Sequence, residues 1–310
     1  MADRLFTDSE LTALGRTPGQ QLTDCLEVGD EVGPVTVSIA RAYHDQISGS
    51  RSWVGWVFAY IAERHGHEGL SRAVAATSRF YAALASLGGS GPNVLLHAEG
   101  ATDGFDDEVD RLVGLVQVGD RDGALAAFDT FESACRAVQD SYRDWLSALL
   151  SEVYRSWGLE ELEAVHRYCA ERTLLPWMPV DIRNPPDKRL LRWVRMLKGH
   201  FSVLRVREDD EKFTLVQDPC GTCSRQILDG RYDPPVNLAV VEERHVVTWG
   251  RGATPIYRTH VPVWHVAMAR ERLGVPWPVN HCPAGLGTRP CETLLYKDPL
   301  DPRADDQVPS

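Results

Sequence analysis

The sequence predicts an α+β protein in which a helical N-terminal domain is followed by a smaller β-rich, metal-binding domain. Apolar residues recur at helical spacing from residue 32 to residue 198, and the pattern changes to short strands from residue 201. Four of the seven cysteines fall between Cys220 and Cys291. We therefore expect an N-terminal extension (1–31), a helical domain (32–198), a β-rich Cys/His domain (199–298) and a loose, Pro-rich and acidic tail (299–310).

The composition is typical of a globular chain without membrane spans. Hydrophobic residues make up 43% and charged residues 25% of the 310 positions. The net charge, 33 minus 44 or −11, disfavours nucleic-acid binding. No apolar run approaches the roughly 18 residues that cross a bilayer, and the N-terminus lacks a secretory signal pattern. We expect a cytoplasmic protein whose partner is a small molecule, and the sequence does not predict its oligomeric state.

The clearest helix covers residues 51–64, where Val54, Val57, Phe58 and Ile61 form one apolar stripe. Gly66 ends this helix and an Ala-rich helix follows over 68–87. The same pattern returns 92 residues later, with five identities in the twenty positions of 51–70 and 143–162. We interpret this as a duplicated helix–Gly–helix hairpin packed as a bundle. The alternative is chance similarity between two amphipathic helices.

Breaks are expected in two places within the helical region. Residues 88–104 are Gly-rich and polar and should form the loop between the two copies. Pro176, Pro179 and the segment 184–187 form the second break, and a short helix follows over 188–198.

The last third of the chain is predicted to form short strands and one helix. Residues 201–206 and 212–216 flank the charged segment 208–211, which predicts a hairpin with a solvated turn. Further strands are expected over 236–241, 245–249 and 293–296. Residues 263–273 should form a helix, because Gly274 and Pro276 close it.

The strongest local motif is the C-x2-C pair of Cys220 and Cys223, which follows a predicted strand. This spacing lets two thiolates converge on one ion, and the neighbouring Pro219 and Gly221 shape the turn. The same motif also occurs in redox dithiols, where it opens a helix. Residues 224–232 read instead as turn and strand, which favours a metal over redox chemistry.

A second half of the metal site is expected further along the chain. We predict that the ligands come from Cys220, Cys223, His265, Cys282 and Cys291. Zinc is the leading candidate, and iron fits the same donors. Four cysteines would make a closed structural site, whereas three protein ligands and a water would make a catalytic one. An iron–sulfur cluster is a further alternative.

The preferred function is a metal-dependent enzyme that acts on a small organic molecule by hydrolytic or lyase-type chemistry. His260 and His281 are the candidate general bases, and substrate contacts are expected among Arg258, Trp264, Glu271, Trp277, Asn280 and Tyr296. One alternative is a non-enzymatic small-molecule-binding or adaptor protein with a structural zinc. A second is a thiol redox protein that uses Cys220 and Cys223. The sequence contains no Walker A loop, G-x-G-x-x-G motif or nucleophile elbow.

Overall fold

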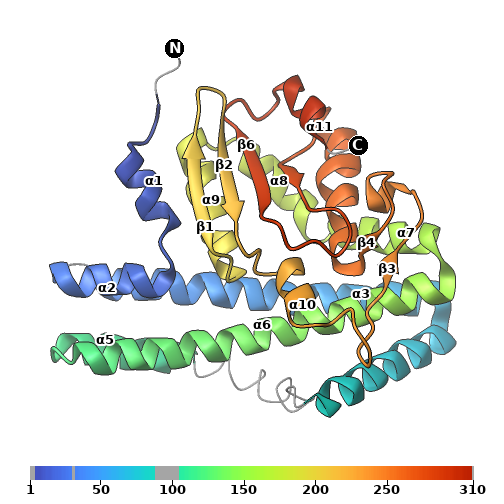
Figure 1. Ribbon diagram of the computed structural model, residues 1–310, viewed down its shortest axis with the longest axis horizontal. Helices are drawn as coiled ribbons and strands as arrows, with labels where there is room; N and C mark the ends of the chain where they lie inside the picture. Colours follow the sequence, from blue (N-terminus) through green and yellow to red (C-terminus); the bar gives the residue numbers. More distant parts are fainter. Residues whose placement is uncertain (1–3, 30–31, 88–104, 309–310) are drawn as a thin grey trace.

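The computed structural model describes residues 4–29, 32–87 and 105–308. It confirms the predicted α+β class: long helices occupy the N-terminal part, and a small antiparallel sheet lies in the C-terminal part (Figure 1). The predicted loop over 88–104 lies outside the described residues.

Eight helices of the described chain precede the sheet. Thr7 and Thr17 cap the first two, each with a reciprocal hydrogen bond from the residue three positions later. Their bounds, in chain order, are α1 Asp8–Gly15, α2 Pro18–Val28, α3 Val32–Ser86, α5 Phe105–Gln117, α6 Arg121–Trp157, α7 Leu159–Ala170, α8 Leu174–Ile182 and α9 Pro186–Gly199.

Helices α3 and α6 run side by side in the same direction (Figure 1). The hydroxyl of Tyr43 bonds Glu132, and the ring of His65 stacks on Trp157 at 3.8 Å. These partners are 89 and 92 residues apart, so the packing register lies within one helical turn of the 92-residue offset of the sequence repeat.

Each long helix bends at a glycine in an extended, positive-φ conformation. Gly66 inside α3 has φ 60° and ψ −151°, and Gly158 between α6 and α7 has φ 86° and ψ −168°. Residues with a side chain rarely adopt such backbone angles, so both positions favour glycine. The matching backbone geometry supports the interpretation of a duplicated helix–Gly–helix unit.

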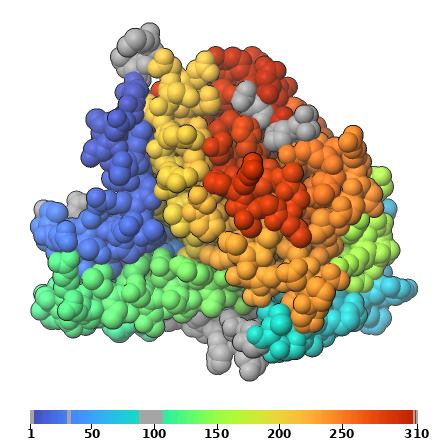
Figure 2. All heavy atoms as spheres, in the orientation of Figure 1, coloured from blue at the N-terminus to red at the C-terminus, as the bar shows by residue number. Residues whose placement is uncertain are grey.

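The main sheet has the strand order β1-β2-β6-β5 and is antiparallel throughout. Its strands are β1 Leu204–Glu208, β2 Lys212–Gln217, β5 Val279–His281 and β6 Cys291–Tyr296, so the predicted hairpin and the predicted final strand are confirmed. One hydrophobic core includes Leu149 of α6, Leu190 of α9 and Phe213 of β2. Accordingly, the yellow-to-red C-terminal segments rest directly on the blue and green helices (Figure 2).

Three local predictions are wrong. Only Val240–Val241 (β3) of the predicted strand 236–241 is extended, paired with β4 Thr254–Pro255, and 245–249 contains a 3-10 turn at Val246–Thr248. The thiol motif opens a short helix, α10 Cys223–Leu228, and no strand follows it there. Apolar content suggested the strands over 236–241 and 245–249, but Val240–Val241 joins only a second, two-stranded sheet and Val247 packs in the core. The turn residues Asp229 and Gly230 suggested turn and strand after the thiol motif, but they follow the end of α10.

The second expected break is confirmed in part, and the tail is not loose: the chain breaks between α8 and α9, at 183–185, but not at the two earlier prolines. Pro176 and Pro179 lie inside α8 and do not interrupt it. Pro176 occupies the first turn, where backbone N–H groups have no helical partner to lose. The tail forms a 3-10 helix over Pro302–Gln307, and Ala304 is buried there. This tail is held by Arg303, which bonds Asp301 and Glu211.

Candidate metal centre and cavity

The antiparallel pairing of β2 and β6 brings three cysteines together. Cys220 and Cys223 follow the end of β2, whereas Cys291 is the first residue of β6 and pairs with Gln217. The end of one strand and the start of its antiparallel neighbour lie at the same edge of a sheet. The sulfur atoms of Cys220, Cys223 and Cys291 therefore lie within 4.8 Å of one another, and all three residues are buried.

Gly221 makes the tight turn between the first two cysteines possible. A Cβ atom at this position would lie 1.8 Å from the carbonyl oxygen of His200, so no side chain fits. The Gly221 N–H donates to the hydroxyl of Ser202 at 2.9 Å. The hydroxyl of Thr222 lies 3.2 Å from the sulfur of Cys220. The turn is thus fixed against the end of α9 and the segment after it.

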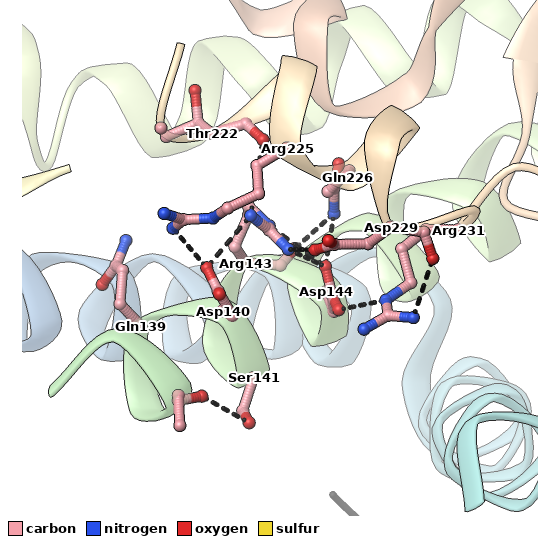
Figure 3. A network of polar contacts seen from close by, with 12 residues as sticks. Gln139, Asp140, Ser141, Arg143, Asp144, Thr222, Arg225, Gln226, Asp229 and Arg231 are labelled. Carbon is pink, nitrogen blue, oxygen red and sulfur yellow. Dashed lines mark hydrogen bonds and ion pairs between the residues drawn. The ribbon is translucent and has the colours of Figure 1, made fainter. Parts of the chain in front are cut away.

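A buried ion-pair network holds α10 on α6 (Figure 3). Arg143 is 1% exposed and pairs with Asp140 at 3.0 Å and with Asp144 at 2.8 Å. It also donates to the carbonyl of Thr222, inside the cysteine turn, at 3.4 Å.

Further charges complete this network: Arg225 pairs with Asp140, Arg231 with Asp144, and Asp229 with Arg143. Burial raises the pKa of Asp144, but Arg143 and Arg231 outweigh this and hold the pKa below its usual value. Three cations face three anions, so the network is electrically balanced within the protein.

Arg258 is the cation closest to the thiol group. It is 1% exposed, and its Nη2 donates to the sulfur of Cys223 at 3.6 Å. Its Nη1 donates to the carbonyls of Pro283 at 2.5 Å and Gly285 at 3.0 Å. The guanidinium thereby ties the cysteine turn to the loop that follows Cys282.

The thiols share protons unequally. Hydrogen bonding to Cys223 raises the pKa of Cys220 to about 12. Hydrogen bonds from Cys220 and Cys291, together with Arg258, lower the pKa of Cys223. A thiolate at Cys223 supplies the negative charge that the buried Arg258 requires.

Cys282 lies at the edge of this group. It follows β5, is half-buried and interacts with the thiol of Cys291, but it is not among the three sulfur atoms that lie within 4.8 Å of one another. The structure therefore brings Cys220, Cys223 and Cys291 into one cluster and places Cys282 beside it.

His281 does not line the cavity that the cysteines face. Successive side chains of a strand point to opposite faces, and Asn280 of β5 takes the cavity side. His281 faces a surface hollow, with its Nδ1 3.6 Å from a carboxylate oxygen of Glu292.

The three clustered cysteines form part of the wall of a cavity of about 320 Å³. This volume is within the usual range for small-molecule sites. The remaining wall is mainly uncharged and comes largely from α3, α8, α9 and the segment 257–265. Its aromatic members are Trp53, Trp177, Trp193, His200, Tyr257, His260, Trp264 and His265.

A π-helical turn places two of these histidines on the same side of their helix. The predicted helix over 263–273 exists, but Pro262–Ala267 is π-helical and only Met268–Leu273 (α11) is a regular α-helix. Residues five apart are about one turn apart in a π-helix. His260 and His265 therefore both face the cavity, with ring centroids 6.4 Å apart.

Backbone hydrogen bonds fix the tautomers of both rings. Nδ1 of His260 lies 2.6 Å from the carbonyl of Tyr257, and Nδ1 of His265 lies 3.1 Å from that of Trp277. Burial lowers the pKa of His260 to about 3 and of His265 to about 4, so both rings are neutral near pH 7. Each Nδ1 therefore carries the proton, and each Nε2 has a lone pair without a hydrogen-bond partner in the described chain.

The other residues expected to contact a substrate divide into two sets. Arg258, Trp264 and Asn280 line the cavity. Glu271 pairs with Arg167 at the surface, and Trp277 is buried with its indole N–H on Asp181. Tyr296, also buried, belongs to a separate small apolar cluster.

Sequence reasoning missed Trp53, Trp177 and Trp193 as cavity residues. Trp53 could have been found, because it is one of the identities of the internal repeat. Trp177 and Trp193 carry no such signal, since indoles on amphipathic helices usually pack in the core.

Comparisons with protein-family models, with curated proteins and with solved structures gave no match. Among the described residues, no helix is both long and apolar enough to cross a membrane. The function is therefore argued from the cavity and its residues.

Proposed function

We propose that the protein is a metal-dependent enzyme, with zinc as its preferred ion, that acts on a small organic molecule by hydrolytic or lyase-type chemistry. The observation that carries the proposal is the group of three buried thiols in the wall of a cavity that four tryptophans also line. Cys220, Cys223 and Cys291 would hold the ion. A fourth position, toward the cavity, would take water or substrate.

The spacing of the sulfur atoms suits a single ion. Zinc–sulfur bonds of about 2.3 Å in a tetrahedron place the sulfur atoms roughly 3.8 Å apart. The cysteine sulfurs already lie within 4.8 Å of one another, so small rotations would complete the geometry. In a [4Fe–4S] cluster each thiolate binds its own iron, which requires wider spacing, and a [2Fe–2S] cluster requires a second pair of ligands on its other iron.

The charges near the thiols also favour a metal. Three thiolates and one divalent ion carry a net charge of −1, which the buried guanidinium of Arg258 would neutralise. A bound ion would act as a Lewis acid on a substrate oxygen. His260, neutral and with Nε2 unprotonated, would accept the proton that the reaction releases.

A closed structural site is the second candidate. Cys282 interacts with Cys291 and could complete a set of four thiolates. Such a site would stabilise the sheet edge without serving a reaction, as in an adaptor or binding protein. The role of Cys282 therefore separates the two candidates.

The test measures metal content and turnover on the same purified protein. We expect about one zinc or iron per chain, with metal-dependent hydrolysis of the activated ester 4-nitrophenyl acetate. Cys291→Ala should lose both, whereas Cys135→Ala should retain both, because Cys135 is buried within the core near Glu132 of α6.

Histidine variants provide the matched comparison. His260→Asn should lose turnover but keep its metal, whereas His281→Asn should keep both because His281 lies outside the cavity lining. Folded wild-type protein without metal, even after reconstitution with zinc or iron, would overturn the proposal. A readily titrated dithiol at Cys220 and Cys223 in such protein would support the redox alternative.

A further inference from the structure

Every charged side chain in the described part of the cavity wall already has a partner of opposite charge within the protein. Its charged members are Arg258, Glu292 and the thiolate of Cys223. Arg258 is bound to Cys223 and to two backbone carbonyls, and Glu292 pairs with Arg207 at 3.0 Å. Nδ1 of His260 and Nδ1 of His265 each lie within hydrogen-bond distance of a backbone carbonyl, and burial lowers the pKa of His200, His260 and His265, which keeps these rings neutral near pH 7. An ionised ligand would leave water without gaining an unpaired side chain of opposite charge, which is unfavourable. An ion held by three thiolates beside Arg258 would add no net charge, so the cavity suits an uncharged ligand.

The aromatic wall suits a flat ligand. Trp53 and Trp264 are 4.4 Å apart, and Trp177 and Trp193 are 5.5 Å apart, between ring centroids. The indole N–H of Trp264 donates to the carbonyl of His166, and that of Trp193 donates to Asp181. These bonds fix the orientation of the rings, whose faces and edges then offer stacking and edge-on contacts to a planar ring.

His260 and His265 can accept hydrogen bonds from a ligand. Both present an unprotonated Nε2 to the cavity, and both are fixed in that tautomer by a backbone carbonyl. A ligand without N–H or O–H groups would leave these acceptors desolvated and unpaired, which costs about 1–3 kcal/mol for each. The ligand should therefore carry a donor beside the group that reacts.

We propose that the cavity binds an uncharged, planar cyclic amide or imide, with its N–H group accepted by Nε2 of His260 or His265 and its carbonyl directed toward the cysteine centre. This inference rests on the proposed function and names the substrate class of the same site. The reaction would be ring opening: water adds to the carbonyl carbon, the ring C–N bond breaks, and the nitrogen takes up a proton. The ring and one water become an open-chain product with a carboxyl group and an amide or amine.

Three related probes test the ligand chemistry on the metal-loaded chain. Phthalimide is flat, uncharged and carries an N–H group; N-methylphthalimide lacks this donor; phthalamate is the ring-opened anion. Binding is measured by quenching of tryptophan fluorescence, and ring opening by the loss of imide absorbance. We expect phthalimide to bind at least about tenfold more tightly than either of the others, since one unmet hydrogen bond or charge has that effect.

Two pairs of variants test the histidines. The side-chain nitrogen of Asn occupies the position of Nδ1, so His260→Asn and His265→Asn keep the backbone bond and remove the Nε2 acceptor. The side-chain oxygen of Gln reaches the position of Nε2, so His260→Gln and His265→Gln keep an acceptor there. The Asn variant of the histidine that contacts the ligand should bind phthalimide at least about tenfold more weakly than the Gln variant of the same position.

Failure of this inference can be told apart from failure of the proposed function. Equal binding of phthalimide and its N-methyl derivative, tighter binding of phthalamate, or no binding to protein with one metal per chain would overturn the substrate class alone. Metal-free protein that still binds phthalimide through the histidines would overturn the enzyme proposal and leave the ligand class standing.

Discussion

Two buried polar clusters flank α10, and they are satisfied in different ways. On the α6 side, Arg143, Arg225 and Arg231 face Asp140, Asp144 and Asp229, and every charge has a partner in the chain (Figure 3). On the cavity side, three thiols share one cation, and two imidazoles present lone pairs without partners among the described residues. The first cluster is complete and supports structure. The second presents thiols and lone pairs that could bind an ion or a ligand, and the proposed function is placed there for that reason.

The largest effect should come from breaking the complete cluster. Arg143→Met leaves Asp140 and Asp144 short of their central partner, and removal of one member of a buried ion network costs about 3–5 kcal/mol. Chemical denaturation monitored by circular dichroism measures the loss. Added zinc should not restore it, because the network contains no metal ligand.

Arg79→Met is the control for this prediction. Arg79 forms an exposed pair with Glu152 between α3 and α6, and such pairs contribute about 0–1 kcal/mol. A similar loss of stability in both variants would show that the buried network has no special role in holding α10.

Removal of the metal should have the next largest effect. An ion that binds only the folded chain stabilises it by about 2.7 kcal/mol when its free concentration is 100 times its Kd. A strong chelator should therefore lower the melting temperature of wild-type protein and of Cys135→Ala. Cys291→Ala should already melt at a lower temperature and show no further decrease, and a chelator response equal to that of the wild type would remove Cys291 from the ligand set.

The buried histidines predict a loss of stability in acid. Burial lowers the pKa of His260 to about 3, below the value near 6.5 expected in the unfolded chain. The unfolded state then binds more protons, so this contribution is fully present above pH 6.5 and declines as the pH falls toward 3.

The change of the free energy of unfolding with pH tests the predicted direction of this effect. Between pH 6 and pH 5, His260 should contribute a decline of up to about 1.4 kcal/mol per pH unit to the free energy of unfolding. His260→Asn should flatten the measured dependence by about that amount, whereas the exposed His67 provides a control in His67→Asn. Parallel slopes for wild type and His260→Asn would mean that His260 is protonated in the folded protein.

The sequence predicts the parts of these clusters that depend on local spacing. The C-x2-C motif after a strand correctly predicted that Cys220 and Cys223 lie close together, and the helix–Gly–helix pattern predicted the bends at Gly66 and Gly158. Pairing of β2 with β6 brings Cys291 to the motif. That pairing depends on contacts far apart in the sequence, so spacing alone could not choose among the later cysteines.

The shared face of the two histidines and the network around Arg143 could be recognised only from the tertiary structure. His260 and His265 share a face only because a π-turn separates them, and regular α-helical periodicity places them on different faces. Arg143 lies within the repeat and reads as an ordinary helix residue, yet it anchors the cysteine turn through Thr222. Its partners Thr222 and Asp229 flank α10, a helix that the sequence did not predict, so the network could not be predicted either.

The smallest effect is expected at Cys282. Its substitution tests whether the cysteine centre has three thiolate ligands or four. Cys282 is half-buried and outside the group of three close sulfur atoms. If the fourth position faces the cavity, Cys282→Ala should keep one metal per chain and change the free energy of unfolding by less than about 1 kcal/mol. Elemental analysis and denaturation measure both quantities, with Cys291→Ala as the variant that must lose the ion. Loss of metal in Cys282→Ala would instead mean a closed set of four thiolates, and the cavity-side cluster would then be as complete, and as structural, as the network around Arg143.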